Sequence, residues 1–515
     1  MKKRLLVIAC LFLSLFMFSA CGESGGNAPT TLTIWFMGGS VDNVNGPVVE
    51  AANARLQELG LDIAINPIWT GGWSMGDAAQ IALNTGDSSI DIYWTGSWGL
   101  NFWNNARVGN FVRLDDPDFN LIEMYGDEMK AALPQALWDA FTADGPLGHG
   151  IYGIPGYKDY SQLHTWDVNV TRLEELGFAF DDLFDMDGLN YDVFFDPQFE
   201  AAMQAAKDKW GPTFFPLFPE PNNMVQHLSI RDSDLTTLQV FDFAFDPSDP
   251  KLPENPVIGI TLEKERDLRI LEKMHHFWNL GFIDPRMAIP SESSVVMSEA
   301  LLAGEYLFGS TAYAYGHTQS ASDLRGIDAR FPKISMPIIS SVSAAGSGFG
   351  ISAYSQNQSA AMQFMNAWYT DTTLATILCE GVEGIHWNLN DEGLVVLDEV
   401  GRASYSTWRF GMGNIFALMP RNTDPGGHDY FRQFSEYNEA GTPTALLGFT
   451  FNNESIALQV SALTGVLNEY NQALTVGAVN PAIIVPEFLA ALKANGLDIV
   501  HEELNRQIQE FYNSK

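Results

Sequence analysis

The chain has 515 residues, of which 46% are hydrophobic, and its 63 acidic residues outnumber 28 basic ones to give a formal net charge of −35. This length predicts two or three domain-sized units with cores large enough to be stable by burial alone. The negative charge argues against nucleic acid as a partner, and against anionic ligands except in a locally basic pocket. It leaves neutral solutes such as sugars open.

The N-terminus has the form of a signal peptide. Basic residues at positions 2–4 precede an apolar run from Leu5 to Phe18, which is long enough for a signal-peptide core but short for a membrane-spanning helix. Ala20 and Cys21 follow, and a small residue directly before a cysteine resembles the lipobox of bacterial lipoproteins. The resemblance implies that residues 1–20 are removed and that Cys21 carries a lipid anchor on the extracytoplasmic face of the cell membrane. A plain secretory signal with a chance cysteine is the alternative.

Residues 21–30 are rich in Gly, Ser and Asn, which predicts a flexible tether. Residues 1–20 contain three basic and no acidic residues, so the chain from Cys21 onwards has a net charge of −38. Beyond Cys21 the chain retains a single cysteine, Cys379, which excludes an intramolecular disulfide between unmodified cysteines. We expect Cys379 to be a core residue because it ends an apolar run.

Strands and helices alternate after the tether. The sequence pattern predicts strands at residues 31–36, 62–65 and 90–94. It predicts helices between them at residues 47–59 and 75–84. This order predicts a parallel sheet that binds its ligand at the carboxyl ends of its strands. Further along the chain, helical spacing predicts helices at residues 262–277, 294–302, 358–369 and 500–511 and a short strand at residues 305–310.

Aromatic and glycine residues follow each of the first three predicted strands. Trp35 is followed closely by Gly38 and Gly39, Trp69 and Trp73 flank two further glycines, and Trp94 and Trp98 flank Gly96. Aromatic rings stack on the flat C–H faces of sugars, and glycine lets the backbone approach a ligand closely. The pattern favours a sugar pocket at this edge of the sheet. Trp35 and Trp94 lie within strands and are the strongest candidates for core residues instead.

Several blocks resemble the extracellular solute-binding proteins of maltose- and oligosaccharide-type ABC importers. They are TLTIW at 31–35, IYGIP at 151–155 with LHTWDVN at 163–169, EALLAGEYLFGS at 299–310, and GISAYSQNQSAAMQFMNAWYTD at 350–371. EGIHW at 383–387 and the region from about 448 to 515 resemble LipO-like lipoproteins of this class. His164 and Trp166 depart from the family pattern.

The resemblance implies an α/β, two-lobed periplasmic-binding-protein-like fold in which hinge strands join the lobes and hinge bending closes them on a ligand. We expect residues 30–155 and 350–410 in lobe 1. We expect residues 158–345 and 411–515 in lobe 2, including the LipO-like segment. The implied partners are a neutral oligosaccharide and the permease subunits of an ABC transporter.

The candidate ligand-binding residues combine the strand-end positions with those that follow the family blocks. They are Trp35, Ser40, Trp73, Ser97, Trp98, Tyr157, Lys158, Tyr313, Tyr315, His386 and Trp387. We expect no cofactor, no catalytic residue and no metal. Asp185, Asp187 and Asp192 weakly resemble a calcium loop, but Leu183 and Phe194 occupy two of its ligand positions. An extracellular carbohydrate-active enzyme and a peptide-binding lipoprotein are the alternative functions.

Overall fold

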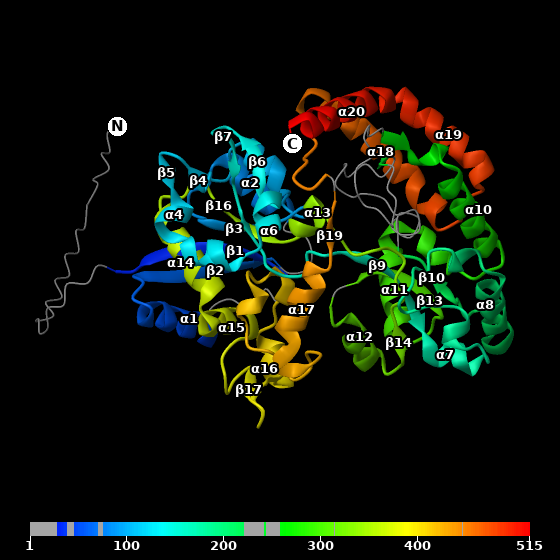
Figure 1. The fold of residues 1–515 in the computed structure, drawn as a ribbon, viewed down its shortest axis with the longest axis horizontal. Coiled ribbons are helices and arrows are strands. Elements are labelled where there is room, and N and C mark those ends of the chain that lie inside the picture. The colour runs from blue at the N-terminus through cyan, green and yellow to red at the C-terminus, as the bar shows by residue number, and fades with distance from the viewer. Residues whose placement is uncertain are drawn as a thin grey trace, which may run out of the picture.

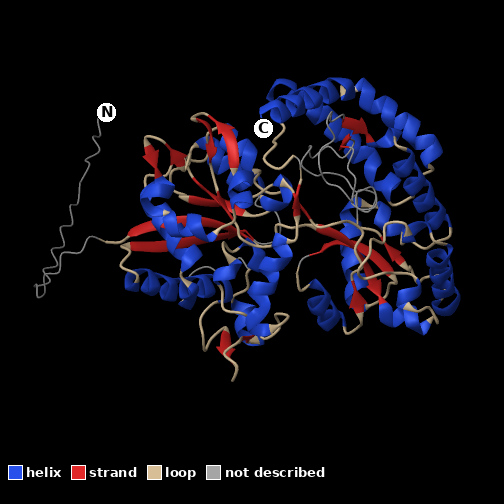
Figure 2. Cartoon of the chain, in the orientation of Figure 1, coloured by secondary structure: helices blue, strands red, loops and turns tan. Residues whose placement is uncertain are grey.

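The chain folds around two separate hydrophobic cores. The computed structural model describes residues 28–38, 46–70, 76–220, 241–243, 258–313, 315–444 and 446–514. One core takes its buried residues from positions 32–160 and 339–434, and the other takes them from 166–334 and 446–508. We call these two units lobe 1 and lobe 2. In each lobe, helices lie around a central sheet (Figure 2). The predicted signal peptide and Cys21 lie outside the described residues.

Lobe 1 is built on a five-stranded sheet. Its strands, in spatial order, are β2 (Ile63–Thr70), β1 (Thr30–Met37), β3 (Ile92–Thr95), β16 (Gly348–Ile351) and β8 (Ile154–Pro155). The first three strands are parallel, as predicted, whereas β16 runs antiparallel to both of its neighbours. Alternation in β1 places Leu32, Ile34 and Phe36 in the core. The carboxyl ends of β1 and β3 therefore meet at one edge of the sheet.

Helices cover this sheet, and short hairpins extend from it. Helix α1 (Pro47–Glu58) begins with a proline, which suits a first helical position, and buries Val48, Ala52 and Leu56 at helical spacing. The remaining helices of lobe 1 are α2 (Gly76–Thr85), α3 (Phe102–Arg107), α4 (Leu121–Tyr125), α5 (Asp127–Ala132), α6 (Gln135–Ala140), α14 (Gln358–Thr370), α15 (Thr372–Glu380), α16 (Glu399–Ser404) and α17 (Tyr430–Glu439). The hairpins pair β4 (Asp115–Asp116) with β5 (Phe119–Asn120), β6 (Thr142–Gly145) with β7 (Gly148–Ile151), and β17 (Trp387–Leu389) with β18 (Val395–Leu397).

Lobe 2 is built on a four-stranded sheet with the order β10 (Leu217–Phe218), β13 (Phe308–Tyr313), β9 (Leu163–Asn169) and β14 (Ala329–Arg330). A separate hairpin pairs β11 (Phe241–Phe243) with β12 (Ile258–Ile260). The helices are α7 (Val170–Glu175), α8 (Pro197–Trp210), α10 (Glu265–Asn279), α11 (Pro290–Ala303), α12 (His317–Arg325), α18 (Ala457–Thr475), α19 (Pro481–Ala494) and α20 (Leu497–Ser514). The last three pack against α10 and β12, so the C-terminal segment completes the core of lobe 2 (Figure 1).

Three segments cross between the lobes and form the hinge. Gln162, on the way from β8 to β9, exchanges backbone hydrogen bonds of 2.7 and 2.8 Å with Ile338 in β15 (Ile338–Ile339). Strand β15 also pairs with β19 (Thr442–Pro443). The short helix α13 (Ser341–Ala344) follows β15 directly. The hinge is thus a small three-stranded layer between the two sheets.

One expected lobe boundary is wrong. We expected residues 411–515 in lobe 2, but Met412, Ile415, Leu418, Tyr430 and Phe434 are buried in the lobe 1 core. The reason is that the third crossing occurs at β19, so the chain stays with lobe 1 until residue 442. The segment from Leu446 onwards joins the second core.

Candidate functional site

A tight turn at the carboxyl end of β3 positions Ser97 and Trp98. The Ser97 amide donates to the carbonyl of Ala345 at 2.8 Å, and the Ser97 hydroxyl donates to the carbonyl of Val342 at 2.9 Å. Leu100, two residues after Trp98, has a φ of 41°, a left-handed conformation that is strained for a residue with a side chain. Ser97 is buried and fixes the turn, which leaves Trp98 to face outwards.

Trp98 belongs to a cluster of three tryptophans. Its ring is 50% exposed, and its Nε1 donates to the carbonyl of Gly346 at 2.7 Å. The ring centroid lies 5.3 Å from that of Trp94 and 5.8 Å from that of Trp408, both in edge-to-face geometry. Trp94 is fully buried and donates its own indole N–H to Ser347. The cluster therefore has a buried base and a partly exposed ring at the sheet edge.

Trp408 is a candidate that the sequence pattern did not identify. It lies in a loop far from β1 and β3 along the chain, and no periodic element surrounds it. Gly38, at the end of β1, allows its approach, because a Cβ on Gly38 would lie 2.9 Å from the Trp408 Cβ. A buried ion-pair network holds the neighbouring Arg409, whose Nη1 lies 2.8 Å from Asp424 and whose Nε lies 3.6 Å from Glu380. The loop and its tryptophan are thereby fixed.

Lys158 lies beside the tryptophan cluster on the first crossing segment. Its Nζ donates to the carbonyl and the carboxylate of Asp159 at 2.8 and 2.9 Å. The same Nζ lies 3.2 Å from the position that a Cβ on Gly346 would take, so Lys158 and Trp98 both border Gly346. The structure thus brings together two of the predicted residues from different parts of the chain.

Tyr157, next to Lys158, is a packing residue. Its ring is buried and stacks on Phe416 with centroids 4.0 Å apart. Burial raises the pKa of its hydroxyl, so it stays protonated at neutral pH. The packing of this ring stabilises the first crossing segment.

Tyr313 and Tyr315 lie at the end of β13 and contact helix α17. The Tyr437 hydroxyl donates to the carbonyl of Tyr313 at 3.2 Å, and the Tyr315 hydroxyl donates to the side-chain oxygen of Gln433. The Tyr315 ring also packs against Phe434, and burial raises the pKa of its hydroxyl. Both tyrosines therefore join a strand of lobe 2 to a helix of lobe 1.

Trp35 packs within lobe 1. Its ring is half-buried and stacks on Tyr93, and its Nε1 donates to Thr70 on the neighbouring strand at 2.6 Å. We therefore assign Trp35 to the packing of the sheet. Ser40 and Trp73 lie outside the described residues.

The prediction that His386 and Trp387 line the pocket is corrected by the structure. His386 is buried and its Nδ1 accepts the amide N–H of Val382, and burial lowers the pKa of its imidazole. Trp387 is also buried and donates its indole N–H to Gly381. Figure 1 shows β17 at the lower end of lobe 1, away from α13 and the hinge. Both rings are buried and hydrogen-bonded within lobe 1, so they stabilise the region of the β17–β18 hairpin and are not available to a ligand.

The described part of the chain carries no group of three or more His, Cys, Asp or Glu side chains arranged to hold a metal ion. A search of the same residues finds no helix with the length and apolar character needed to cross a bilayer. Cys379 is buried in the lobe 1 core, as expected, and burial raises the pKa of its thiol to about 12.

Comparison with known proteins connects this fold to ABC transporters. The domain family DUF3502, a domain of unknown function, matches residues 445–513. A carbohydrate ABC transporter substrate-binding protein of Streptococcus pneumoniae is 21% identical over 96% of each chain.

Solved structures give the same result. The N-glycan transport solute-binding protein NgtS of S. pneumoniae is 19% identical, with 94% of this chain and 100% of that one covered and a TM-score of 0.76. The alginate-binding protein AlgQ2 is 17% identical, with coverage of 94% and 98% and a TM-score of 0.59. These similarities confirm the resemblance predicted from the sequence blocks, and the chain has the fold of the substrate-binding proteins of carbohydrate ABC transporters.

Proposed function

We propose that this protein is the extracytoplasmic solute-binding subunit of an ABC importer and that it captures a neutral oligosaccharide between its lobes. The observation that carries the proposal is Trp98, a half-exposed ring fixed at the carboxyl end of β3 and backed by Trp94 and Trp408. A ring held in this way offers an apolar face for a sugar at little cost in conformational entropy.

The fold supports the mode of capture. The tryptophan cluster belongs to lobe 1, Lys158 lies on a crossing segment, and Tyr313 ends a strand of lobe 2. Bending at the hinge would bring the lobes together on a ligand and exclude water from its polar contacts. The proposed oligosaccharide is neutral because the chain carries a net charge of −35.

The proposed ligand class also agrees with the relatives. The structure of NgtS in complex with Man5GlcNAc has a TM-score of 0.68 to this chain. We propose a neutral glycan of this kind as the first candidate, and we propose that Cys21 anchors the protein by a lipid beside its permease.

Calorimetry with a matched pair of ligands tests the function. Man5GlcNAc is the neutral probe and an alginate oligosaccharide is the anionic one. We expect saturable binding of the neutral glycan at micromolar concentration, weaker or no binding of alginate, and recovery of the intact glycan afterwards. Release of shorter sugars would indicate an enzyme, and binding of peptides with no glycan binding would indicate the peptide-binding alternative.

A further inference from the structure

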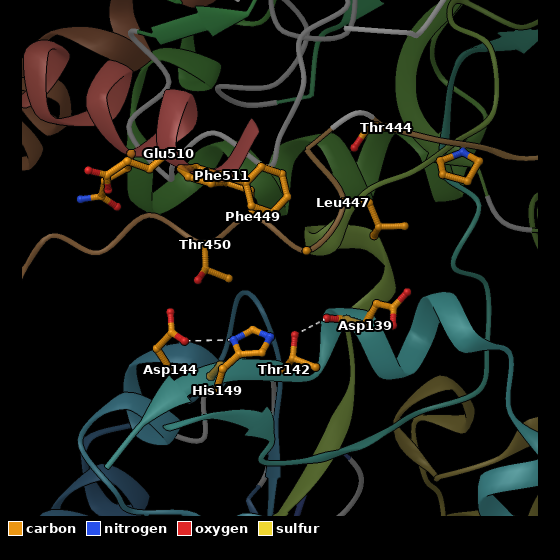
Figure 3. A pocket seen from close by; sticks show the side chains of 14 residues that line it. Asp139, Thr142, Asp144, His149, Thr444, Leu447, Phe449, Thr450, Glu510 and Phe511 are labelled. Atoms are coloured by element: carbon orange, nitrogen blue, oxygen red, sulfur yellow. Dashed lines mark hydrogen bonds and ion pairs between the residues drawn. The ribbon is translucent and has the colours of Figure 1, made fainter. Parts of the chain in front are cut away.

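The C-terminal helices of lobe 2 also face lobe 1 across a cavity. The cavity has a volume of about 700 Å³. Its lobe 1 wall consists of α6 and the β6–β7 hairpin, and its other wall consists of residues 443–450 and the end of α20 (Figure 3). Apart from Pro443 and Thr444, this second wall belongs to the segment matched by DUF3502, whose role is unknown.

Contacts within each wall keep its shape. On the lobe 1 side, His149 lies 2.9 Å from Asp144, and the Thr142 hydroxyl donates to the carbonyl of Asp139. On the other side, Gln507 holds Asn452 through two hydrogen bonds. The dashed contacts in Figure 3 join residues of the lobe 1 wall, and Thr450 points from the C-terminal wall into the space between the walls. On the second wall, Phe449 and Phe511 pack together in lobe 2, whereas Leu447 packs against the lobe 1 core.

The cavity lies on the opposite side of the hinge from helix α17. Figure 1 shows α20, β6 and β7 above β19 and α13, and α17 below them. Trp408 lies on the α17 side, because its neighbour Phe410 packs against Phe434 of α17. When two lobes rotate about a hinge, approach on one side means separation on the other. Closure around the tryptophan cluster would therefore widen this cavity.

Helix α13 connects the cavity wall to the sugar site directly. The Val342 carbonyl accepts the hydroxyl of Ser97, beside Trp98. The Ser341 hydroxyl, on the same short helix, accepts the amide N–H of Gly448 at 2.7 Å. The start of the DUF3502 segment and the turn that carries Trp98 are thus both hydrogen-bonded to the four-residue helix α13.

Charge also acts between the two lobes. Burial lowers the pKa of the Arg107 guanidinium in lobe 1, while the carboxylates of Glu454, in the C-terminal segment, and Asp144, in lobe 1, oppose this shift. An attraction between Arg107 and Glu454 favours approach of the C-terminal segment to lobe 1, and hence lobes that are apart at the tryptophan cluster.

We propose that the DUF3502 segment is a lever that sets the balance between open and closed lobes, and hence the affinity of the sugar site. The segment acts from behind the hinge, through the width of the cavity. The proposal rests on the proposed function only for the identity of the ligand, since the lobe equilibrium itself is a property of the free protein.

Spin labels test the lever without a ligand. The mature chain with Cys21→Ser would carry labels at Val400→Cys in lobe 1 and Leu324→Cys in lobe 2, because these side chains are 83% and 71% exposed. Their helices, α16 and α12, lie on the α17 side of the hinge (Figure 1). Cys379 is buried and should not label. The distance between the labels then reports closure.

Thr450→Trp would prop the cavity walls apart and should shift the label distances of the free protein to shorter values. The matched control is Thr464→Trp, which changes an exposed threonine on α18. If Thr450→Trp does not fold, Glu454→Gln provides the second variant. It should give a smaller shift in the same direction, with exposed Glu502→Gln as its control.

Unchanged or longer distances in a folded Thr450→Trp protein would overturn the proposal. In a separate arm, Thr450→Trp should bind Man5GlcNAc about fivefold more tightly than the parent protein. A distance shift in a protein that binds no glycan would uphold the lever and refute the proposed function. Glycan binding together with an unchanged distance between the labels would uphold the proposed function and refute the lever.

Discussion

Asn438 in α17 donates a hydrogen bond from its carboxamide to the main-chain carbonyl of Lys158 at 2.9 Å. The carboxamide oxygen of Asn438 also accepts the amide N–H groups of Tyr160 and Ser161. The Asn438 side chain is fully buried, so one residue satisfies three backbone groups of the first crossing segment. This contact fixes the place where the chain leaves lobe 1, directly beside the tryptophan cluster.

Asn438→Leu should destabilise the fold. Each buried backbone group that loses its partner costs about 1–3 kcal/mol, so the loss should be at least of this size. Urea unfolding followed by tryptophan fluorescence would measure it. Exposed Asn468→Leu on α18 would serve as a surface control, with an expected change of less than about 0.5 kcal/mol. Equal effects of the two changes would contradict the role of Asn438.

Trp98→Ala should weaken sugar binding and leave stability nearly unchanged. The substitution removes a stacking face of about 1 kcal/mol and the area that a sugar buries on it, so the affinity for Man5GlcNAc should fall at least several-fold. Titration calorimetry measures this change. Trp94→Ala is the contrasting variant, because removing a fully buried tryptophan costs about 3–5 kcal/mol of stability. Unaltered affinity in a folded Trp98→Ala protein would remove Trp98 from the site.

Asp424→Asn should destabilise lobe 1. Asp424 and Arg409 form a buried pair with side chains 8% and 9% exposed, and the Asp424 carboxylate also accepts the amide N–H of Arg421. Removing one charge of a buried pair typically costs about 3–5 kcal/mol, since the other charge stays buried. Calorimetric melting would show this loss. Asp429→Asn, at an exposed pair with Arg432, should have almost no effect.

Stability should fall between pH 6.5 and pH 4 because of His164. Burial lowers the pKa of this imidazole to about 4 in the folded protein, against 6.5 in an unfolded chain. The unfolded state then binds the proton first, so the stability is fully present above pH 6.5 and is lost as the pH falls towards 4. The shift corresponds to about 3 kcal/mol. Urea midpoints at pH 7 and pH 5 would show the loss, and His164→Gln should reduce it, whereas exposed His149→Gln should not.

Cys21→Ser should release the protein from the membrane or leave it unprocessed. The change removes the thiol on which we propose the lipid is attached. Fractionation of cells, followed by detection of the protein in the membrane and the medium, measures the outcome. A processed and acylated Cys21→Ser protein in the membrane fraction would contradict the anchor.

The sequence predicted those parts of the fold in which one face of an element is buried. Apolar alternation located β1, and helical spacing located α10 and α14, because burial of one face imposes a period on the sequence. The boundary at residue 411 failed for the converse reason. Residues 412–429 pack through short turns and loops, which have no period to detect, and α17 begins only at Tyr430.

The proposed sugar site was predictable only in part. Trp98 follows a strand and a glycine, and that local pattern identified it. Trp408 has no such signal, since only the folded chain brings it to Gly38. His386 and Trp387 show the opposite error. They lie in the EGIHW block, and aromatic side chains of such a block can fill a core as well as line a pocket.

The route of the chain has a consequence for the order in which the protein can fold. The lobe 2 core needs Trp166 as well as Ile508, which lie 342 residues apart in a chain of 515 residues. Lobe 1 can assemble when synthesis has passed Phe434, whereas lobe 2 must wait for the last helix. Until then, its apolar sheet and α10 stay uncovered, and a chain cut short before α18 would expose them to aggregation. A late-closing core of this kind leaves lobe 2 incomplete until the end of synthesis.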